Sequence, residues 1–223
     1  MTKLLTPQEI ADTLQAAAGA GFESARCTEW AEGIKGKTSK QVWLRISRES
    51  LLPTLERLVQ IHFPHVSVIA FADVGDAVEL IYQFHVYWGI PHEEILVVFT
   101  VPLPKTDLKV PTITGIIPGA LTSEREKQEM LGIEVVGIPD GRRMFLPDDF
   151  PQGVYPWRND ETGIPDGMIK ELWATGRDTV PAPEPPPPPP PPPAPEEPPA
   201  PPAPAAPPAP QQNTTEQPPL SDG

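Results

Sequence analysis

Proline limits the folding options of this chain more than any other residue. Of the 35 prolines in 223 residues, 22 lie between residues 181 and 223. Proline lacks a backbone N–H and has a restricted φ angle, so it interrupts helices and central strands. Nine prolines between Pro102 and Pro165 leave room there for one solid helix, predicted from Ser123 to Leu131. We therefore expect an α+β domain at residues 1–103, an extended irregular arm at 104–180 and a proline-rich tail at 181–223.

The tail contains five acidic residues, no lysine or arginine and no aromatic side chain. Such a composition buries too little apolar surface to offset the conformational entropy of folding, so we expect it to be disordered. The unbroken run Pro185–Pro193 predicts a stiff polyproline II rod of roughly 28 Å, at ~3.1 Å per residue. The rod fits a spacer. It also fits a ligand for the groove of an SH3- or WW-like domain, although no arginine or lysine flanks it.

Hydrophobic periodicity predicts the regular elements of the first domain. Thr6 and Glu9 form a capping box around a proline, so a helix should follow to about Ala18. Apolar residues recur at helical spacing from Glu49 to Ile61. Alternating or β-branched residues predict four strands. These strands are Gln41–Ser47, Val66–Ala72, Val78–Trp88 and Glu94–Val101. The expected fold class is α+β, with a mainly antiparallel sheet of about four strands flanked by helices.

The charge of the chain excludes two classes of partner. The formal net charge is −13, and no cluster of lysines and arginines is present. Such a chain is a poor ligand for the phosphate backbone of a nucleic acid or for an anionic membrane surface. The longest apolar run, Ile95–Leu103, falls far short of the ~20 residues that span a bilayer. The N-terminal residues lack an apolar segment long enough for a signal peptide. If the protein works at a membrane, another chain must hold it there.

The sequence shows no self-contained reaction centre. A single thiol, Cys27, cannot form an internal disulfide or a cysteine-rich metal site, and it fits a small buried or strand-borne residue in a reducing cytoplasm. The histidines His62, His65, His85 and His92 lack the spacing of metal ligands. No glycine-rich phosphate loop, GxSxG or HExxH motif occurs.

The segment Thr122–Arg158 concentrates charged and turn-forming residues. Ser123 and Glu126 fit a capping box, and Arg125 and Glu129 are spaced to pair across one helical turn. These two interactions explain the helix itself. They do not explain why the helix exit leads directly into a second polar turn that contains two arginines.

That second turn has the composition of a contact surface. The pair Arg142–Arg143 precedes Leu146–Asp149, and these charges fit either a solvated surface or a bidentate arginine–carboxylate contact, within the arm or across an interface. Mixed charge beside Met144, Phe145 and Phe150 is typical of the rim and core of a protein interface rather than of a catalytic cleft.

The order of short motifs in this region closely resembles the signature of the 30-kDa subunit family of respiratory complex I. The matching motifs are Pro111-Thr112-Ile113-Thr114, Glu124-Arg125-Glu126, Glu129, Gly132-Ile133, Gly137-Ile138-Pro139-Asp140, Arg142-Arg143 and Leu146-Pro147-Asp148-Asp149. The resemblance covers about residues 40–160. Several motifs in the right order make it specific.

Some positions depart from the pattern of that family. Glu129 stands in place of its usual aspartate, Leu131 in place of its phenylalanine and Ile138 in place of its histidine. The segment Tyr155–Asp160 replaces a closing Pro-Leu-Arg-Lys-Asp. These departures resemble the branch found in membrane-bound NiFe hydrogenases and related ferredoxin-linked complexes.

The resemblance implies a cofactor-free structural and assembly subunit of a membrane-associated energy-converting oxidoreductase. Such a subunit packs in the peripheral arm, on the cytoplasmic side of the cell membrane, against a large NiFe-type subunit and a cluster-bearing small subunit. The NiFe centre and iron–sulfur clusters, or quinone, would belong to those partners. The residues expected at the subunit interface are Glu124, Arg125, Glu126, Glu129, Gly132, Pro139, Asp140, Arg142, Arg143, Leu146, Pro147, Tyr155, Trp157 and Arg158.

Three other functions stay open at this level. The chain could be the 30-kDa subunit of an NADH-quinone oxidoreductase proper. It could be a soluble adaptor that recruits a partner through the polyproline tail. It could also be an enzyme that acts alone through acidic residues in no known motif, although its adjacent acid pairs fit solvated turns better than catalytic carboxylates.

Overall fold

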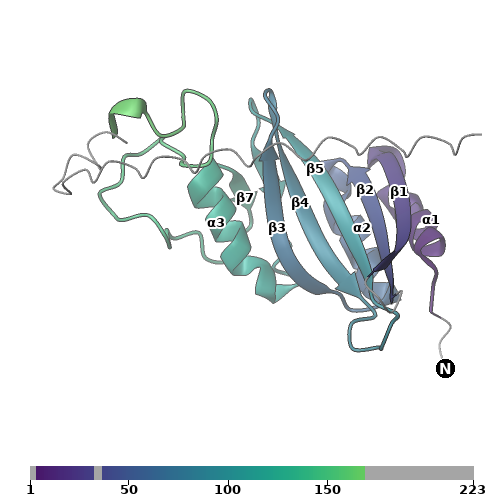
Figure 1. Cartoon of the computed structure of the whole chain (residues 1–223). Coiled ribbons are helices and arrows are strands. Elements are labelled where there is room, and N and C mark those ends of the chain that lie inside the picture. The colour runs from purple at the N-terminus through teal and green to yellow at the C-terminus, as the bar shows by residue number, and fades with distance from the viewer. Residues whose placement is uncertain (1–3, 33–36, 169–223) are drawn as a thin grey trace, which may run out of the picture. The chain divides into compact units, whose positions relative to one another are not determined.

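The computed structural model describes residues 4–32 and 37–168, which all belong to one compact unit (Figure 1). The predicted disordered tail, residues 181–223, lies outside the described residues. Five strands form the main sheet. They are β1 (Phe22–Glu32), β2 (Lys37–Ile46), β3 (His65–Asp73), β4 (Ala77–Val86) and β5 (Ile95–Pro104).

The strands of this sheet lie in the order β1-β2-β5-β4-β3. Neighbouring strands are antiparallel except for β2 and β5, which run parallel with Val42 opposite Val97. The predicted α+β fold with a mainly antiparallel sheet is therefore confirmed. All four predicted strands are present, and the sheet gains a fifth, β1, that the pattern analysis missed.

Strand β1 was missed because its side chains are largely exposed and show no apolar alternation. It pairs with β2 alone, and none of its described side chains is fully buried. An edge strand of this kind needs few apolar residues and so lacks the alternation by which strands are recognised.

Two helices pack together beside β1 and β2 (Figure 1). Helix α1 spans Pro7–Ala18 and continues as the short 3-10 helix η1 (Gly19–Gly21). The predicted capping box is confirmed, because the Thr6 hydroxyl accepts the N–H of Glu9 and the Glu9 carboxylate accepts the N–H of Thr6.

Helix α2 spans Leu51–Ile61. The predicted helix Glu49–Ile61 is therefore confirmed with a later start, because its first residues form the separate 3-10 helix η2 (Arg48–Ser50). Four residues of α2 are buried, and they include three leucines, as its helical periodicity predicts.

One hydrophobic core joins the sheet, these helices and part of the arm. Every second residue of β4 from Val78 to Val86 is buried. Phe84 makes an edge-to-face contact with Phe99 of β5, with their ring centroids 5.3 Å apart. Ile113 and Leu131, both from beyond the sheet, belong to the same buried cluster. The first part of the arm therefore packs into the core of the sheet.

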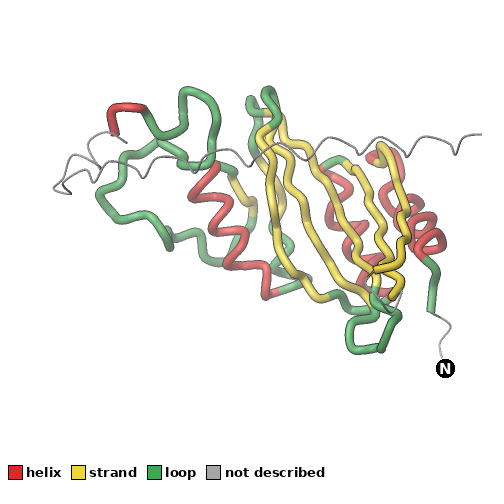
Figure 2. The backbone as a smooth tube through the Cα atoms, viewed as in Figure 1, coloured by secondary structure: helices red, strands yellow, loops and turns green. Residues whose placement is uncertain are grey.

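Up to Pro165 the arm contains four short regular elements. They are β6 (Lys109–Pro111), the 3-10 helix η3 (Pro118–Ala120), α3 (Leu121–Leu131) and β7 (Glu134–Val136). Strands β6 and β7 pair in parallel, and α3 lies beside β3 (Figure 1). Helix α3 confirms the predicted helix and begins two residues earlier. From β7 to Pro165 the described chain is loop, as Figure 2 shows.

None of the described helices is long and apolar enough to cross a membrane.

Candidate subunit interface

The predicted interface residues gather on α3 and on the loops that fold back against it. The helix has no side-chain cap, because its N-cap residue is Ala120 and the preceding 3-10 turn already supplies its first hydrogen bonds. The predicted capping box between Ser123 and Glu126 is therefore wrong, since Ser123 lies inside the helix. The carboxylate of Glu126 instead contacts the ammonium group of Lys127.

Glu124 points into the protein. It is 3% exposed, and it accepts hydrogen bonds from the N–H of Ile113 at 2.7 Å and from the hydroxyl of Thr112 at 2.5 Å. Burial raises its pKa, while the two hydrogen bonds favour the charged form and act in the opposite direction. Glu124 therefore fastens the segment that follows β6 to the first turn of α3.

Arg125 holds the backbone of the loop at residues 138–150, which we call the 138–150 loop. Its guanidinium donates two hydrogen bonds to the carbonyl oxygen of Arg142, at 2.8 and 2.9 Å, and one to that of Arg143 at 3.2 Å. The predicted ion pair between Arg125 and Glu129 is therefore wrong, because both side chains reach across to the loop.

Glu129 binds the N–H groups of the same loop, whereas Arg125 binds its carbonyl oxygens. Its carboxylate accepts three consecutive backbone N–H groups, those of residues 144–146, at distances of 2.6 to 3.0 Å. Burial alone would raise its pKa, but these hydrogen bonds bring the pKa below its usual value. Gln128 adds one bond to the carbonyl oxygen of Gly141 at 3.2 Å.

The arginine pair is also engaged within the arm. Arg142 makes a bidentate contact with Asp140, at 2.9 and 2.8 Å, which holds the pKa of that carboxyl far below its ordinary value. Arg143 donates to the carbonyl oxygens of Pro147 and Phe150, at 3.4 and 3.2 Å. The arginine–carboxylate contact considered above thus forms inside the arm.

The side chains that the 138–150 loop turns outward are apolar or charged. Phe145 is 54% exposed and Met144 37% exposed. The side chain of Arg142 is 84% exposed despite its contact with the loop, and Asp148 and Asp149 are exposed as well. The backbone of this loop is therefore tied to α3 while these side chains face solvent.

The C-terminal end of α3 is capped by residues 155–158 of the arm. Gly132 adopts φ +71°, and a Cβ added there would lie 2.5 Å from the ring of Tyr155. The N–H of Trp157 donates to the carbonyl oxygen of Met130 at 3.1 Å, and the Arg158 guanidinium donates to that of Leu131 at 3.3 Å. These contacts satisfy backbone groups that a helix end leaves unpaired.

Trp157 connects this part of the arm to the sheet. Its indole stacks on Phe71 of β3, with ring centroids 5.0 Å apart and planes 8° from parallel. The ammonium nitrogen of Lys127 lies 5.0 Å from the indole centroid, in a cation–π contact. This placement explains why Lys127 is buried although it is charged.

Four charged residues form a second connection between the arm and the sheet. Lys105 lies 2.8 Å from Asp73 and 2.7 Å from Asp160, and Arg158 lies 2.6 Å from the same oxygen of Asp160. The hydrogen bond from Lys105 is the largest contribution that lowers the pKa of Asp160. Lys105 and Asp73 were not predicted as arm contacts, because Asp160 and Arg158 lie far along the chain and no local spacing pairs them with the arm.

The remaining predicted interface residues lie in the 138–150 loop. Pro139 and Pro147 are exposed, and Leu146 is half-buried. The fourteen predicted residues are thus brought together on α3 and the loops around it. Most of those with hydrogen-bonding side chains hold the arm in shape, and their contact with a partner stays a prediction.

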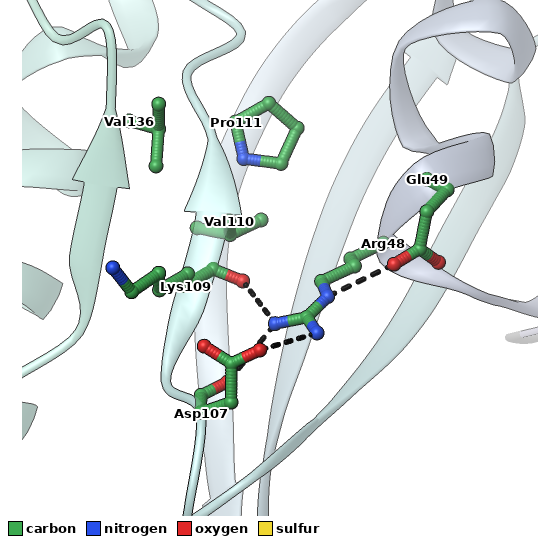
Figure 3. Close-up of a pocket in the computed structure, with 7 residues that line it drawn as sticks. All are labelled: Arg48, Glu49, Asp107, Lys109, Val110, Pro111 and Val136. Carbon is green, nitrogen blue, oxygen red and sulfur yellow. Dashed lines mark hydrogen bonds and ion pairs between the residues drawn. The ribbon is translucent and has the colours of Figure 1, made fainter.

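A cavity of about 330 Å³ opens between η2 and β6 (Figure 3). Arg48 lines this cavity. Its guanidinium donates hydrogen bonds to the carboxylates of Glu49 and Asp107 and to the carbonyl oxygens of Asp107 and Lys109. The apolar part of the wall includes Val136, which is 50% exposed. Because the guanidinium already has partners on both sides, it serves to join η2 to the arm.

The described residues contain no group of three or more histidine, cysteine, aspartate or glutamate side chains that could hold a metal ion. The Nδ1 atom of His85 lies 2.5 Å from a carboxylate oxygen of Glu94. Cys27 lies on β1, as a strand-borne thiol was expected to, and donates to the carbonyl oxygen of Pro7 at 3.5 Å. Burial raises the pKa of this thiol, as do the nearby Asp12 and Glu29.

Comparison with known proteins agrees with the motif resemblance. The family model described as "Respiratory-chain NADH dehydrogenase, 30 Kd subunit" matches residues 44–165. The membrane-bound hydrogenase subunit beta of Pyrococcus furiosus is 37% identical over 139 residues, which cover 60% of this chain and 80% of that protein. The NADH-quinone oxidoreductase C/D subunit of Erwinia tasmaniensis is 32% identical over 129 residues, which cover 53% of this chain and 20% of that protein.

A similar fold occurs in a solved structure of an archaeal respiratory membrane complex, the membrane-bound sulfane sulfur reductase. One of its chains superposes with a TM-score of 0.57 and 18% sequence identity, over 74% of this chain and 90% of that chain. At this identity the similarity concerns the fold alone.

Proposed function

Because this chain belongs to the family of the 30 Kd subunit of respiratory-chain NADH dehydrogenase, we propose that it is a structural and assembly subunit of a membrane-associated oxidoreductase of the membrane-bound hydrogenase and complex I type. The observation that carries the proposal is the match to a membrane-bound hydrogenase subunit beta over 80% of that protein's length. In this role the chain packs against the large NiFe-type subunit in the peripheral arm, on the cytoplasmic side of the membrane.

The geometry of the arm supports a role in assembly. Side chains of α3 hold the 138–150 loop at both carbonyl and N–H groups, so the loop is shaped before any partner arrives. A surface that is ordered in advance loses less conformational entropy on binding than a flexible one. The outward side chains, above all Phe145, combine an apolar centre with charged neighbours, which is the composition of a protein interface.

We assign the redox chemistry to the partner chains. The proposed partners are a large subunit with a NiFe centre or a quinone site and a small subunit with iron–sulfur clusters. The present chain would contribute surface rather than ligands, and its contact with the membrane would run through those other subunits.

Purification from native membranes through a tag on this chain tests the proposal. We expect a NiFe-type large subunit, cluster-bearing chains and membrane subunits to co-purify, with nickel and iron in the preparation. Recovery of the chain alone, or with a single soluble partner, would contradict the proposal. Deleting residues 181–223 distinguishes this proposal from the adaptor hypothesis. Without the tail an adaptor should lose its partner, whereas a complex subunit should still assemble.

A second candidate is the 30-kDa subunit of an NADH-quinone oxidoreductase. The observation in its favour is the 32% identity to the C/D subunit of Erwinia tasmaniensis. The same preparation distinguishes the two candidates. Nickel supports the hydrogenase, whereas iron without nickel, together with quinone reduction, supports the second candidate.

A further inference from the structure

The 138–150 loop carries a pair of neighbouring apolar side chains that the fold leaves uncovered. Phe145 is 54% exposed and Met144 is 37% exposed. The N–H groups of both residues are bound by one carboxylate, that of Glu129, at 2.9 and 3.0 Å. The backbone that carries the two side chains is therefore held in place while the side chains themselves lie in water.

Several backbone groups of this loop are already hydrogen-bonded within the arm. Arg125 takes the carbonyl oxygens of Arg142 and Arg143, and Glu129 takes the next three N–H groups. A partner strand that pairs with the N–H groups of residues 144–146 would have to displace the bonds to Glu129. Recognition through the side chains of the loop displaces none of these bonds, and the largest exposed apolar side chain of the loop is Phe145.

We propose that Phe145 and Met144 form the central contact of this chain with the larger polypeptide of its complex, inserting together into an apolar pocket on that partner, and that Glu129 is the positioning residue that presents them. This inference rests on the proposed function and names the residues through which it operates. Aromatic side chains at the centre of an interface carry a large share of binding energy when their pocket excludes water.

The observations favour a larger polypeptide as the partner that covers Phe145 and Met144. In the Erwinia tasmaniensis relative the matched region makes up 20% of a longer chain, so there the matched region is joined covalently to a larger one. A lipid surface fits poorly, because the chain has a net charge of −13 and Asp148 and Asp149 lie close in sequence to the apolar pair. Exposed charges beside the pair, such as Arg142, suit the polar rim of a protein interface.

The test uses the full chain in its native complex and compares two phenylalanines of nearly equal exposure. Phe145 is 54% exposed, and Phe63, in the connection between α2 and β3, is 52% exposed. We expect Phe145→Asp to lower recovery of the large subunit with the tagged chain by about tenfold or more, the scale of a hot-spot residue. Phe63→Asp should change this recovery less than about twofold. Both isolated variants should melt at the temperature of the wild type.

Phe145→Ser is the second variant, in case a charge at this position disturbs folding. It removes the aromatic ring without adding charge and should also lower recovery of the large subunit. Glu129→Gln should lower recovery of the large subunit as well. In this variant, limited proteolysis should also cut the 138–150 loop faster than in wild type. Faster cleavage indicates that Glu129 positions the loop, because the loss of a direct contact with the partner would not change it.

The outcomes distinguish this inference from the proposed function. If the wild-type chain brings down the oxidoreductase subunits and folded Phe145→Asp brings down the same amount, the inference is overturned while the proposed function stands. If Phe145→Asp only converts a homodimer to a monomer, the occupant is a second copy and the inference is also overturned. If the wild-type chain recovers no such subunits, the proposed function itself fails.

Discussion

The sheet and the arm of this protein are stabilised in different ways. The sheet buries alternate apolar residues, and Phe84 and Phe99 pack against each other in its core. The loops of the arm, from β7 onward, are held by charged side chains that bind backbone groups one by one, as Glu129 does in the 138–150 loop. The sheet therefore depends on the total apolar area that it buries, whereas the arm depends on a few individual side chains.

This difference explains how an irregular segment can present a defined surface. A loop without a helix or strand leaves its N–H and C=O groups unpaired unless side chains satisfy them. Arg125 and Glu129 do so from one face of α3, at positions four residues apart. In the sequence, these charged motifs resemble a surface that contacts another protein. In the structure, many of their side chains instead hold the backbone of the 138–150 loop in place.

The largest expected effect concerns the core that the two regions share. Phe84→Ala should lower the free energy of unfolding by about 3–5 kcal/mol, because it opens a cavity among rings that are fully buried. Since Ile113 and Leu131 belong to the same core, the arm should be lost together with the sheet. Urea unfolding followed by tryptophan fluorescence measures this change. An arm that melts separately from the sheet would contradict the shared core.

The next effect tests the contact that closes α3. Gly132→Ala forces alanine into a left-handed conformation, at a cost of about 1–2 kcal/mol. It also drives a methyl group into the Tyr155 ring, which should add about 1–3 kcal/mol. Gly153→Ala is the matched control, because Gly153 has φ +78° but nothing within 4 Å of its added Cβ. Equal melting temperatures for the two variants would show that the ring contact contributes nothing.

A smaller and more local effect is expected at Glu129. Glu129→Gln leaves three loop N–H groups facing an amide with a single acceptor oxygen, which should cost about 1–3 kcal/mol. The loss should appear as faster hydrogen exchange in the 138–150 loop, with the sheet protected as in wild type. Uniform loss of protection across the sheet would show that the effect of Glu129 is not confined to the 138–150 loop.

The pH dependence of this variant provides a second check. The pKa of Glu129 is lowered on folding, so its contribution to stability is present above the pKa of the unfolded chain. It is lost as the pH falls through the folded pKa. The difference in melting temperature between wild type and Glu129→Gln should therefore shrink as the pH is lowered from about 7 to about 3. Glu124, whose pKa is raised, is common to both proteins, so its opposite contribution cancels to first order in that difference.

The smallest effect should come from a surface ion pair between β6 and β7. Lys109 and Glu134 lie 2.8 Å apart but are 55% and 60% exposed. Glu134→Gln should therefore leave the midpoint of urea unfolding almost unchanged. A loss as large as that at Glu129 would mean that exposed ion pairs, rather than backbone-binding side chains, stabilise the arm.

The local patterns of the sequence predicted several of the regular elements, although the capping box of Ser123 and Glu126 was wrong. The capping box of Thr6 and Glu9, the alternation along β4 and the helix ending at Leu131 all appear where they were expected. Each depends on neighbours within a few residues, so spacing alone predicts it. The family was also recognisable from the sequence, because its motifs follow one another within a short stretch.

The amino-acid sequence by itself thus determined the α+β class, most strands and the family of this protein. Only the tertiary structure decided what the charged motifs do. Glu129 pairs with loop N–H groups instead of Arg125, and Lys105 meets Asp160 far along the sequence. The edge strand β1 likewise became visible only through its pairing with β2. The physical reason is the same in each case, because the partner is far away in the chain and no local spacing encodes it.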